Sequence, residues 1–326
     1  MFLLPLLLAF AQVEAPKTLE IPLAPSNCAG KDWRAGGLKG SFDQKPQLEL
    51  SGWRIEGDNA LTLSGKGLDF LPSKSLSVTV VASIEEAPDW CSLLGCMQDN
   101  GSYERGFFLG SRSGFPCFAV STGKDLVYAR SNQALPLGQP VVLQGTFDGN
   151  KIRLYVNGVE AANAELSGSI AYDAETPLIA GAFRDKDENY PVKGTLHSLS
   201  ISPVVLDAAG ATQEAKQGLA RLPQRPVFDI PPSLTYLAAD RARLDYRCAG
   251  LKNPVLRLRC PGQPPQTLSL AADGSFAIPA GRPFSLEMSA VSAAGRPMIA
   301  GPYNFDAATA FQRVALPASK AVGSCL

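Results

Sequence analysis

Two tight-turn dipeptides, nine residues apart, constrain the fold of this chain more than any other sequence feature. Asp148-Gly149 and Asn157-Gly158 each follow a short apolar segment. Both dipeptides tolerate the positive φ that two-residue hairpin turns require. The spacing therefore predicts a three-stranded antiparallel meander. Its strands are expected at 141–147, at 151–156 and from Val159 onwards.

The composition of the chain also favours short strands. Thirty glycines and 26 prolines in 326 residues favour many short strands joined by turns over long helices. Helical spacing occurs only near 207–222, where Asp207 is a candidate N-cap. The predicted further strands are 61–63, 68–70, 75–83, 92–96, 106–111, 117–121, 177–182 and 194–202.

A second domain is predicted after a proline-rich linker. Residues 222–232 contain four prolines, and short alternating segments follow at intervals of about ten residues. Seven short strands in about ninety residues are typical of an immunoglobulin or fibronectin III-like sandwich. The expected strands are 241–248, 256–260, 266–270, 275–278, 284–291, 298–305 and 311–316. The predicted domains are 16–221 and 233–326.

The N-terminus predicts export. Residues 2–11 form an apolar run that is too short to span a bilayer. Candidate A-x-A-like cleavage sites follow at 9–11 and 13–15, so residues 1–15 are interpreted as a signal peptide. A buried N-terminal strand or helix is the alternative. The mature protein is expected to be secreted or periplasmic, without membrane insertion after cleavage.

Export makes the seven cysteines candidates for disulfide bonds. Cys248 and Cys260 fall on the inward phase of neighbouring predicted strands, so a bond between them is expected. Cys91 and Cys117 lie at the same end of a predicted meander and form the second expected pair. The cysteines without a predicted partner are Cys28, Cys96 and Cys325.

Composition argues against several function classes. Thirty basic residues balance thirty acidic ones, so the chain lacks the basic footprint of a nucleic-acid-binding protein. His197 is the only histidine, which excludes zinc sites built on a pair of histidines. We expect His197 to be structural or solvent-facing.

Catalysis by paired carboxylates is also not expected. Glucanases with a jelly-roll fold commonly carry E-x-D-x-x-E on one strand, and this string is absent. Glu85 and Glu86 are adjacent and precede Pro88-Asp89, so we expect them in a loop. The sequence predicts a protein that is not an enzyme.

Residues 61–215 resemble a laminin G-like, concanavalin A-like jelly roll. The segments that carry the resemblance are GDNALTLSGKGLDF, SLSVTVVASI, VVLQGTFDGNKIRLYVNGVEAA and PLIAGAFRDKDENYPVKGTLHSLSIS. The expected fold class is therefore all-β, a jelly-roll sandwich followed by a smaller immunoglobulin or fibronectin III-like sandwich.

A narrower resemblance concerns 93–101 and 106–110. These segments are similar to the laminin G-like modules of some secreted bacterial metallophosphoesterases. In those proteins a fibronectin III-like domain of the purple acid phosphatase type and then a catalytic domain follow. Residues 226–326 are similar in size and strand pattern to that middle domain. One histidine cannot supply the two-metal site of the catalytic domain, so the chain would be its non-catalytic part.

Two loops are candidate ligand sites. Laminin G-like domains often bind calcium at a rim, and Asp185, Asp187 and Glu188 offer the hard oxygens that calcium requires. Asp99 and Asn100 would join this set only if the two loops converge. The alternative is a solvated loop with local ion pairs.

An aromatic surface is the second candidate site. Trp90, Tyr103 and Arg105 could stack and hydrogen-bond a sugar, although packing is the simpler role for neighbouring aromatic residues such as Phe107. The leading hypothesis is recognition of a glycan or of an extracellular protein partner through rim loops, with calcium as the candidate cofactor. The alternatives are the accessory part of a metallophosphoesterase and a structural or adhesion spacer.

Overall fold

The computed structural model divides the chain into two compact units, residues 1–220 and 221–326, and each is described by itself. The predicted signal peptide, Cys248 and Cys325 lie outside the described residues. No helix among the described residues is long and apolar enough to cross a membrane. The structure describes residues 18–49, 52–64, 71–101, 103–223, 230–247, 252–269, 271, 274–291, 297–305 and 313–315.

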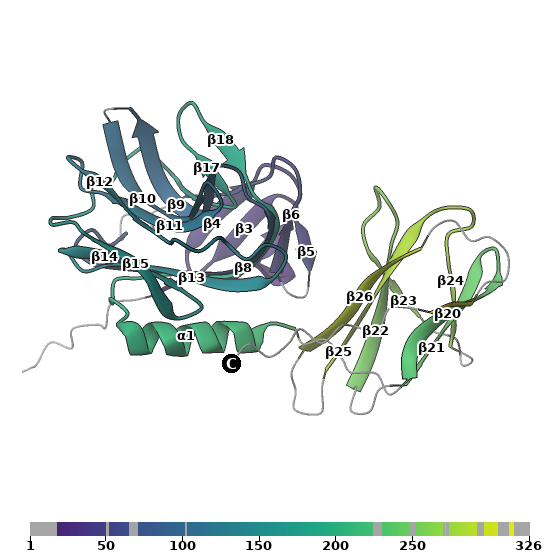
Figure 1. The fold of residues 1–326 in the computed structure, drawn as a ribbon. Helices are drawn as coiled ribbons and strands as arrows, with labels where there is room; N and C mark the ends of the chain where they lie inside the picture. Colours follow the sequence, from purple (N-terminus) through teal and green to yellow (C-terminus); the bar gives the residue numbers. More distant parts are fainter. Residues whose placement is uncertain are drawn as a thin grey trace, which may run out of the picture. The chain divides into compact units, whose positions relative to one another are not determined.

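The first unit is a sandwich of two antiparallel sheets (Figure 1). The first sheet has the order β15-β14-β13-β8-β19-β6-β5, and β1 pairs with β19. Its strands are β1 (Leu19–Ile21), β5 (Gln47–Glu49), β6 (Gly52–Ile55), β8 (Leu76–Glu86), β13 (Pro140–Phe147), β14 (Lys151–Val156), β15 (Val159–Glu165) and β19 (Lys193–Ser202).

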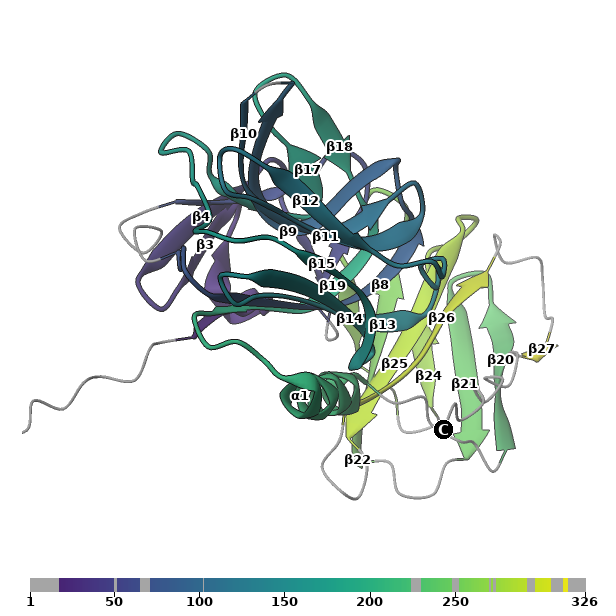
Figure 2. The same cartoon turned by 60° about the vertical axis from the view of Figure 1, so that its left-hand side comes forward.

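The second sheet has the order β12-β11-β10-β9-β16-β7-β4-β3-β2. Its strands are β2 (Cys28–Ala29), β3 (Asp32–Ala35), β4 (Leu38–Phe42), β7 (Leu61–Ser64), β9 (Trp90–Asn100), β10 (Tyr103–Arg112), β11 (Phe115–Ser121), β12 (Leu126–Arg130) and β16 (Leu178–Ala180). A short 3-10 helix (Pro25–Asn27) precedes β2. A separate hairpin, β17 (Ala182–Arg184) and β18 (Asn189–Pro191), lies beside the upper ends of β9 and β10 (Figure 2).

The core lies between the two sheets because alternate side chains of each strand point to the facing sheet. Leu76, Val78 and Val80 share one face of β8, as predicted, and all three are buried in this core. Trp33 and Trp53 are also fully buried there. The prediction of an all-β jelly-roll sandwich is confirmed.

Both predicted meanders are present. β13, β14 and β15 pair in sequence, and the turn between β14 and β15 places Asn157 at φ 51° and Gly158 at φ 81°. β9, β10 and β11 form the second meander, with strands longer than predicted. Strands β1 to β6, β12, β17 and β18 were not predicted, because most are too short to show a period.

The predicted helix is α1 (Ala208–Arg221), and it covers the outer face of the first sheet (Figure 1). Asp207 caps it, since its Oδ1 accepts a hydrogen bond from the Gly210 amide at 2.7 Å. The amide of buried Gln144 in β13 donates to the Ala211 carbonyl at 3.1 Å, which joins helix and sheet.

The expectation of a loop at Glu85 and Glu86 was wrong. Strand β8 continues to Glu86, and cations from β6 and β19 pair with the two carboxylates. Arg54 of β6 binds both Glu85 oxygens, and Lys193 of β19 pairs with Glu86.

The predicted Cys91–Cys117 disulfide is absent, and both thiols are free and buried. Cys91 pairs with Ser111 and Cys117 with Gly110, which is the next residue on β10. Adjacent strand residues point to opposite faces, so these two sulfur atoms lie on opposite sides of the sheet. Burial raises the pKa of Cys91 to about 11 and that of Cys117 to about 12. Cys28, Cys96 and Cys260 are also free, so Cys260 does not form its predicted bond.

The second unit contains two four-stranded antiparallel sheets, with the orders β24-β21-β20-β27 and β23-β22-β25-β26. Their facing sides bury Leu234, Leu286 and Met288, among other apolar residues. The strands are β20 (Ile230–Ala238), β21 (Arg241–Arg247), β22 (Lys252–Arg259), β23 (Gln266–Leu268), β24 (Ser275–Ala277), β25 (Phe284–Val291), β26 (Pro297–Phe305) and β27 (Arg313–Ala315).

The first strand of the second unit begins inside the predicted linker. Strand β20 begins at Ile230 and includes Pro231 and Pro232, which were predicted as linker. The register of β20 against β21 shifts between Ile230 and Ser233. Proline has no amide hydrogen to donate, and such an irregularity is where a strand accommodates it.

Candidate functional site

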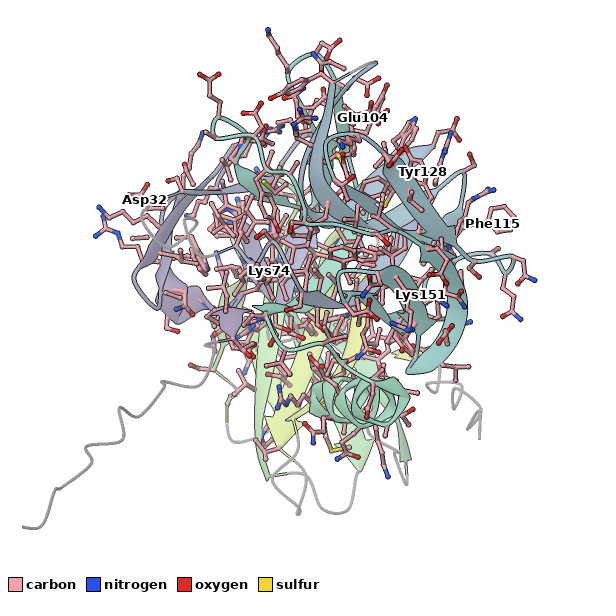
Figure 3. The ribbon with its side chains drawn as sticks, turned by 90° about the vertical axis from the view of Figure 1, so that its left-hand side faces the viewer. Asp32, Lys74, Glu104, Phe115, Tyr128 and Lys151 are labelled. Atoms are coloured by element: carbon pink, nitrogen blue, oxygen red, sulfur yellow. The ribbon has the colours of Figure 1, made fainter. Side chains whose placement is uncertain are left out.

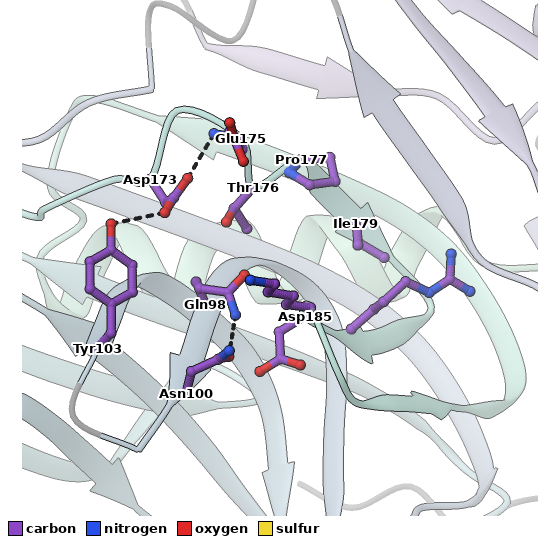
Figure 4. Close-up of a pocket in the computed structure, with 11 residues that line it drawn as sticks. Gln98, Asn100, Tyr103, Asp173, Glu175, Thr176, Pro177, Ile179 and Asp185 are labelled. Atoms are coloured by element: carbon purple, nitrogen blue, oxygen red, sulfur yellow. Dashed lines mark hydrogen bonds between the residues drawn. The ribbon is translucent and has the colours of Figure 1, made fainter.

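A cavity of about 480 Å³ opens at one rim of the first unit (Figure 4). Three chain segments meet around it: the β9–β10 hairpin, the 173–177 segment that leads into β16, and the β17–β18 hairpin. The residues that line it are Gln98, Asn100, Tyr103, Asp173, Glu175, Thr176, Pro177, Ile179, Arg184, Asp185 and Lys186. We call this the rim cavity.

Tyr103 supplies the aromatic side of the rim cavity. Its side chain is 42% exposed, and its hydroxyl donates to Asp173 Oδ2 at 2.9 Å (Figure 4). The Arg105 guanidinium lies 4.4 Å from the Tyr103 ring centroid. Arg105 Nη1 also donates to the carbonyl oxygens of Glu104 and Gly123, at 2.8 and 3.1 Å. Arg105 therefore positions the ring, and it does not line the cavity.

Asp173 lies beside Tyr103 in the lining of the rim cavity. Its Oδ1 accepts a hydrogen bond from the Glu175 amide at 2.7 Å. This bond, followed by the one from the Tyr103 hydroxyl, lowers the pKa of Asp173 below its ordinary value of 3.8. The carboxylate is thus ionised and oriented at neutral pH.

The lowered pKa predicts a pH dependence. A carboxylate with a lowered folded-state pKa stabilises the fold above its ordinary pKa, and this contribution disappears as the pH falls through the lowered value. Wild type should therefore unfold at a higher temperature than Asp173→Asn at about pH 6, and the difference should shrink as the pH falls below about 4. Thermal unfolding of both proteins measures it. A difference that is constant over this range would contradict the assignment.

Asp185 joins the two hairpins. Its Oδ1 accepts the amides of Asp187 and Glu188, at 3.1 and 2.8 Å, and its Oδ2 accepts the amide of Asp99 at 3.3 Å. With its amide nitrogen turned toward acceptors, Asn100 donates to Asp187 Oδ1 at 3.2 Å. The loops thus converge, as the sequence analysis required for Asp99 and Asn100 to act together with this loop.

The β17–β18 hairpin is also bonded to Asp43, the residue that follows β4. Arg184 Nη1 and Nη2 donate to the two carboxylate oxygens of Asp43, at 3.1 and 2.6 Å. Burial raises the pKa of Asp43, but the hydrogen bonds from Arg184 and from the Ala60 amide outweigh it, and the pKa is lowered. The positive charge of Arg184 is therefore balanced by Asp43, which does not line the rim cavity.

The carboxylates of the two hairpins repel one another. The pKa of Asp99 is raised, first by burial and then by the charges of Glu104, Asp185 and Glu188. Among the residues that the structure describes, no group of three or more His, Cys, Asp or Glu side chains is arranged to hold a metal ion. Calcium binding by Asp185, Asp187 and Glu188 stays a prediction.

Trp90 is not part of the same surface as Tyr103 and Arg105. It pairs with Arg112 on β10, whereas Tyr103 and Arg105 occupy the alternate positions of that strand. The sequence-based surface of Trp90, Tyr103 and Arg105 is thus divided between the two faces of the sheet.

Trp90 instead belongs to an aromatic cluster on the outer face. The Arg112 guanidinium lies 4.5 Å from the Trp90 ring and 4.9 Å from the Tyr128 ring. Phe183 of β17 packs against Trp90 at 5.8 Å between centroids. Tyr128 and Glu104, both labelled in Figure 3, lie on this outer face as well. Packing explains the position of Trp90.

Sequence reasoning missed the 173–177 segment. Asp173, Glu175 and Thr176 lie in an irregular connection without a hydrophobic period, so no pattern singled them out. The only local signal was Asp173 two residues before Glu175, which is the spacing of an Asx turn.

His197 sits at an irregularity of β19, and its Nε2 is 2.9 Å from Ser83 Oγ. It does not line the rim cavity.

A family model matches the part of the chain that contains the rim cavity. Residues 56–210 match the laminin G-like family described as the concanavalin A-like lectin/glucanases superfamily. Every residue that lines the rim cavity lies inside this range. The concanavalin A-like superfamily includes both binding proteins and hydrolases by its description, so the match gives the fold without deciding between them. No curated protein matches the sequence of the chain.

Several solved structures are similar to this chain at low sequence identity. Domain 4 of an extracellular GH43 arabinanase from Geobacillus stearothermophilus, solved with arabinotriose, is 17% identical with a TM-score of 0.44. The match covers 61% of this chain and 87% of that one. A CBM40 domain of a Ruminococcus gnavus sialidase, bound to sialyllactose, is 13% identical with a TM-score of 0.44, over 52% and 97% of the two chains.

The Trypanosoma rangeli sialidase is a longer neighbour. It is 12% identical with a TM-score of 0.44, and the match covers 61% of this chain but 32% of the sialidase. This chain therefore corresponds to about a third of that enzyme's length.

Proposed function

We propose that the first unit is a non-catalytic glycan-binding module whose ligand occupies the rim cavity. The observation that carries this proposal is the partly exposed Tyr103 ring beside a cavity lined by the amides of Gln98 and Asn100 and by Asp173. A sugar ring has an apolar C–H face, which suits an aromatic ring. Its hydroxyl groups both donate and accept, which suits amides and carboxylates.

The carboxylates of the cavity favour binding over hydrolysis. A glycosidase pairs a carboxylate with a carboxylic acid whose pKa is raised. Here the pKa of Asp173 is lowered, and the Asp185 carboxylate accepts three backbone amides. The Asp173 carboxylate is therefore suited to accepting hydrogen bonds rather than to donating a proton, and the Asp185 carboxylate holds the two hairpins together.

The proposal also includes where the protein acts and in which form it meets its ligand. The apolar N-terminus supports a secreted or periplasmic location, where the ligand is a free glycan or a glycan on an extracellular protein. Calcium dependence is included as a testable part of it, through the acidic hairpin at 185–188.

For the second unit we propose a sandwich of the fibronectin III type. Its two four-stranded sheets, built from consecutive short strands, support this assignment. It is also the feature that favours the second candidate function, the accessory part of a secreted metallophosphoesterase. A phosphoesterase domain encoded next to this sequence would support that candidate, and an unrelated neighbouring gene would remove its support.

Tyr103→Ala is expected to weaken glycan binding at least about tenfold, because the variant loses the stacking surface. The ring is exposed, so the melting temperature should change little. Tyr103→Phe keeps the ring and loses only the hydroxyl bond to Asp173, so it should retain most of the binding. A glycan array followed by calorimetric titration of the best glycan, with calcium and with chelator, measures these effects.

Leu137→Ala is the matched control. Leu137 is 52% exposed in the same unit and does not line the rim cavity, so its truncation should leave binding unchanged. An array without signal, or equal binding by wild type and Tyr103→Ala, would overturn the proposed function. Hydrolysis of any bound glycan would overturn its non-catalytic part.

A further inference from the structure

We propose that the rim cavity selects its ligand by charge: it binds amine-bearing glycans most tightly, neutral glycans less tightly, and excludes glycans that carry carboxylate or sulfate groups. This inference rests on the proposed function, because it assumes that a glycan occupies the rim cavity. The observation behind it is the unequal distribution of charge in the cavity lining.

The lining carries three carboxylates, those of Asp173, Glu175 and Asp185, and two cations, those of Arg184 and Lys186. Arg184 does not offset the lining carboxylates, because both of its terminal nitrogens donate to Asp43, which lies outside the lining. Three negative charges therefore stand against the exposed ammonium of Lys186. The residues that line the cavity therefore carry a net negative charge.

The negative charge is fixed beside the proposed stacking surface. The Glu175 amide and the Tyr103 hydroxyl hold the Asp173 carboxylate in place, at 2.7 and 2.9 Å. An ammonium group on a sugar that stacks on Tyr103 would meet both a carboxylate and the face of an aromatic ring. A carboxylate at the same position would face a like charge that cannot move away.

Coulomb's law gives the size of the effect. A unit charge about 4 Å from an opposite charge changes affinity about fivefold in water, and more where the protein shields the pair from solvent. We expect about tenfold tighter binding of an amine-bearing glycan than of its neutral counterpart, and at least tenfold weaker binding of an acidic counterpart.

Three hexasaccharides on one backbone separate charge from shape. Chitosan hexaose carries amines, its N-acetylated form is neutral, and its N-succinylated form carries carboxylates. Calorimetric titration of the chain at low ionic strength should give affinities in the order amine, acetyl, succinyl. Added salt should compress the differences, because it screens exposed charges. Succinylated hexaose that binds as tightly as the acetylated form would overturn charge selection.

Glu175→Lys tests whether the net charge of the cavity lining sets the preference. The Glu175 side chain is exposed, and its anchoring contact is made by the backbone amide, so the variant should fold normally. It should lose the preference for the amine and gain affinity for the succinylated hexaose. Glu20→Lys, an exposed change on β1 that is not in the cavity lining, makes the same change in net charge and should behave like wild type.

The two proposals fail in different ways. If no hexasaccharide binds in a manner that depends on Tyr103, the proposed function is wrong and charge selection is wrong with it. If the acetylated hexaose binds through Tyr103 but Glu175→Lys leaves the order of affinities unchanged, only charge selection is overturned.

Discussion

Replacing Gly106 by alanine is expected to destabilise the first unit by about 3 kcal/mol or more. A Cβ atom at this position of β10 would lie 1.6 Å from the carbonyl oxygen of Cys96 on the paired strand. The residue also has φ of +100°, which side chains rarely adopt. Strands β9 and β10 would have to separate, since the obstructing atom belongs to the backbone. Chemical denaturation measures the change in the free energy of unfolding.

Gly114→Ala provides the matched control. Gly114 also has a positive φ, +78°, but nothing lies within 4 Å of a Cβ placed there. Its substitution should cost only the backbone strain, about 1–2 kcal/mol. Equal costs at the two positions would show that β9 and β10 do not pair in this register.

The Gly106 variant should also lose the rim cavity. The Gly106 amide donates to the Ala171 carbonyl at 2.7 Å, and this bond attaches the chain that continues into 173–177 to β10. Separation of the strands would release one wall of the cavity together with Tyr103. Glycan binding should therefore fall in Gly106→Ala and persist in Gly114→Ala.

Asp185→Ala is expected to reduce stability by about 2 kcal/mol, because three backbone amides lose the carboxylate that accepts them. Asp185→Asn keeps one side-chain oxygen and should lose about half as much. Asp187→Ala removes an exposed side chain next to it and should stay within about 0.5 kcal/mol of wild type. Thermal and chemical unfolding in the presence of a chelator measure all three variants.

The chelator separates the two roles considered for Asp185. A backbone acceptor stabilises the hairpin without any metal, so the loss on Asp185→Ala should be the same with and without calcium. A calcium ligand would instead stabilise the protein only when calcium is present. Variants that match wild type in chelator and differ from it in calcium would contradict the structural role.

The negative charges near Asp185 also repel one another where the β9–β10 and β17–β18 hairpins meet. Burial and the charges of Glu104, Asp185 and Glu188 raise the pKa of Asp99, so the ionised form is disfavoured where the two hairpins meet. An arriving cation would relieve this repulsion. The rim cavity, as proposed, and the contact between the two hairpins therefore both favour a positively charged group.

Local patterns were sufficient for the strands whose sequences carry a period or a defined turn. The hairpins at Asp148-Gly149 and Asn157-Gly158 and the cap at Asp207 follow from short stretches of chain, because the atoms that interact are neighbours in sequence. The spacing of apolar segments gave most strands of the second unit for the same reason.

The sequence by itself determined that this chain is built of short antiparallel strands, and that the acidic loop and the aromatic segment are candidates for ligand contact. The face on which each of these side chains lies was decided only by the tertiary structure. Strand register has a period of two, so one residue places Cys91 and Cys117, or Trp90 and Tyr103, on opposite sides of a sheet. Asp173 and Tyr103 are 70 residues apart in the sequence, and only the folded chain brings them together in one cavity. No local sequence pattern encodes that contact.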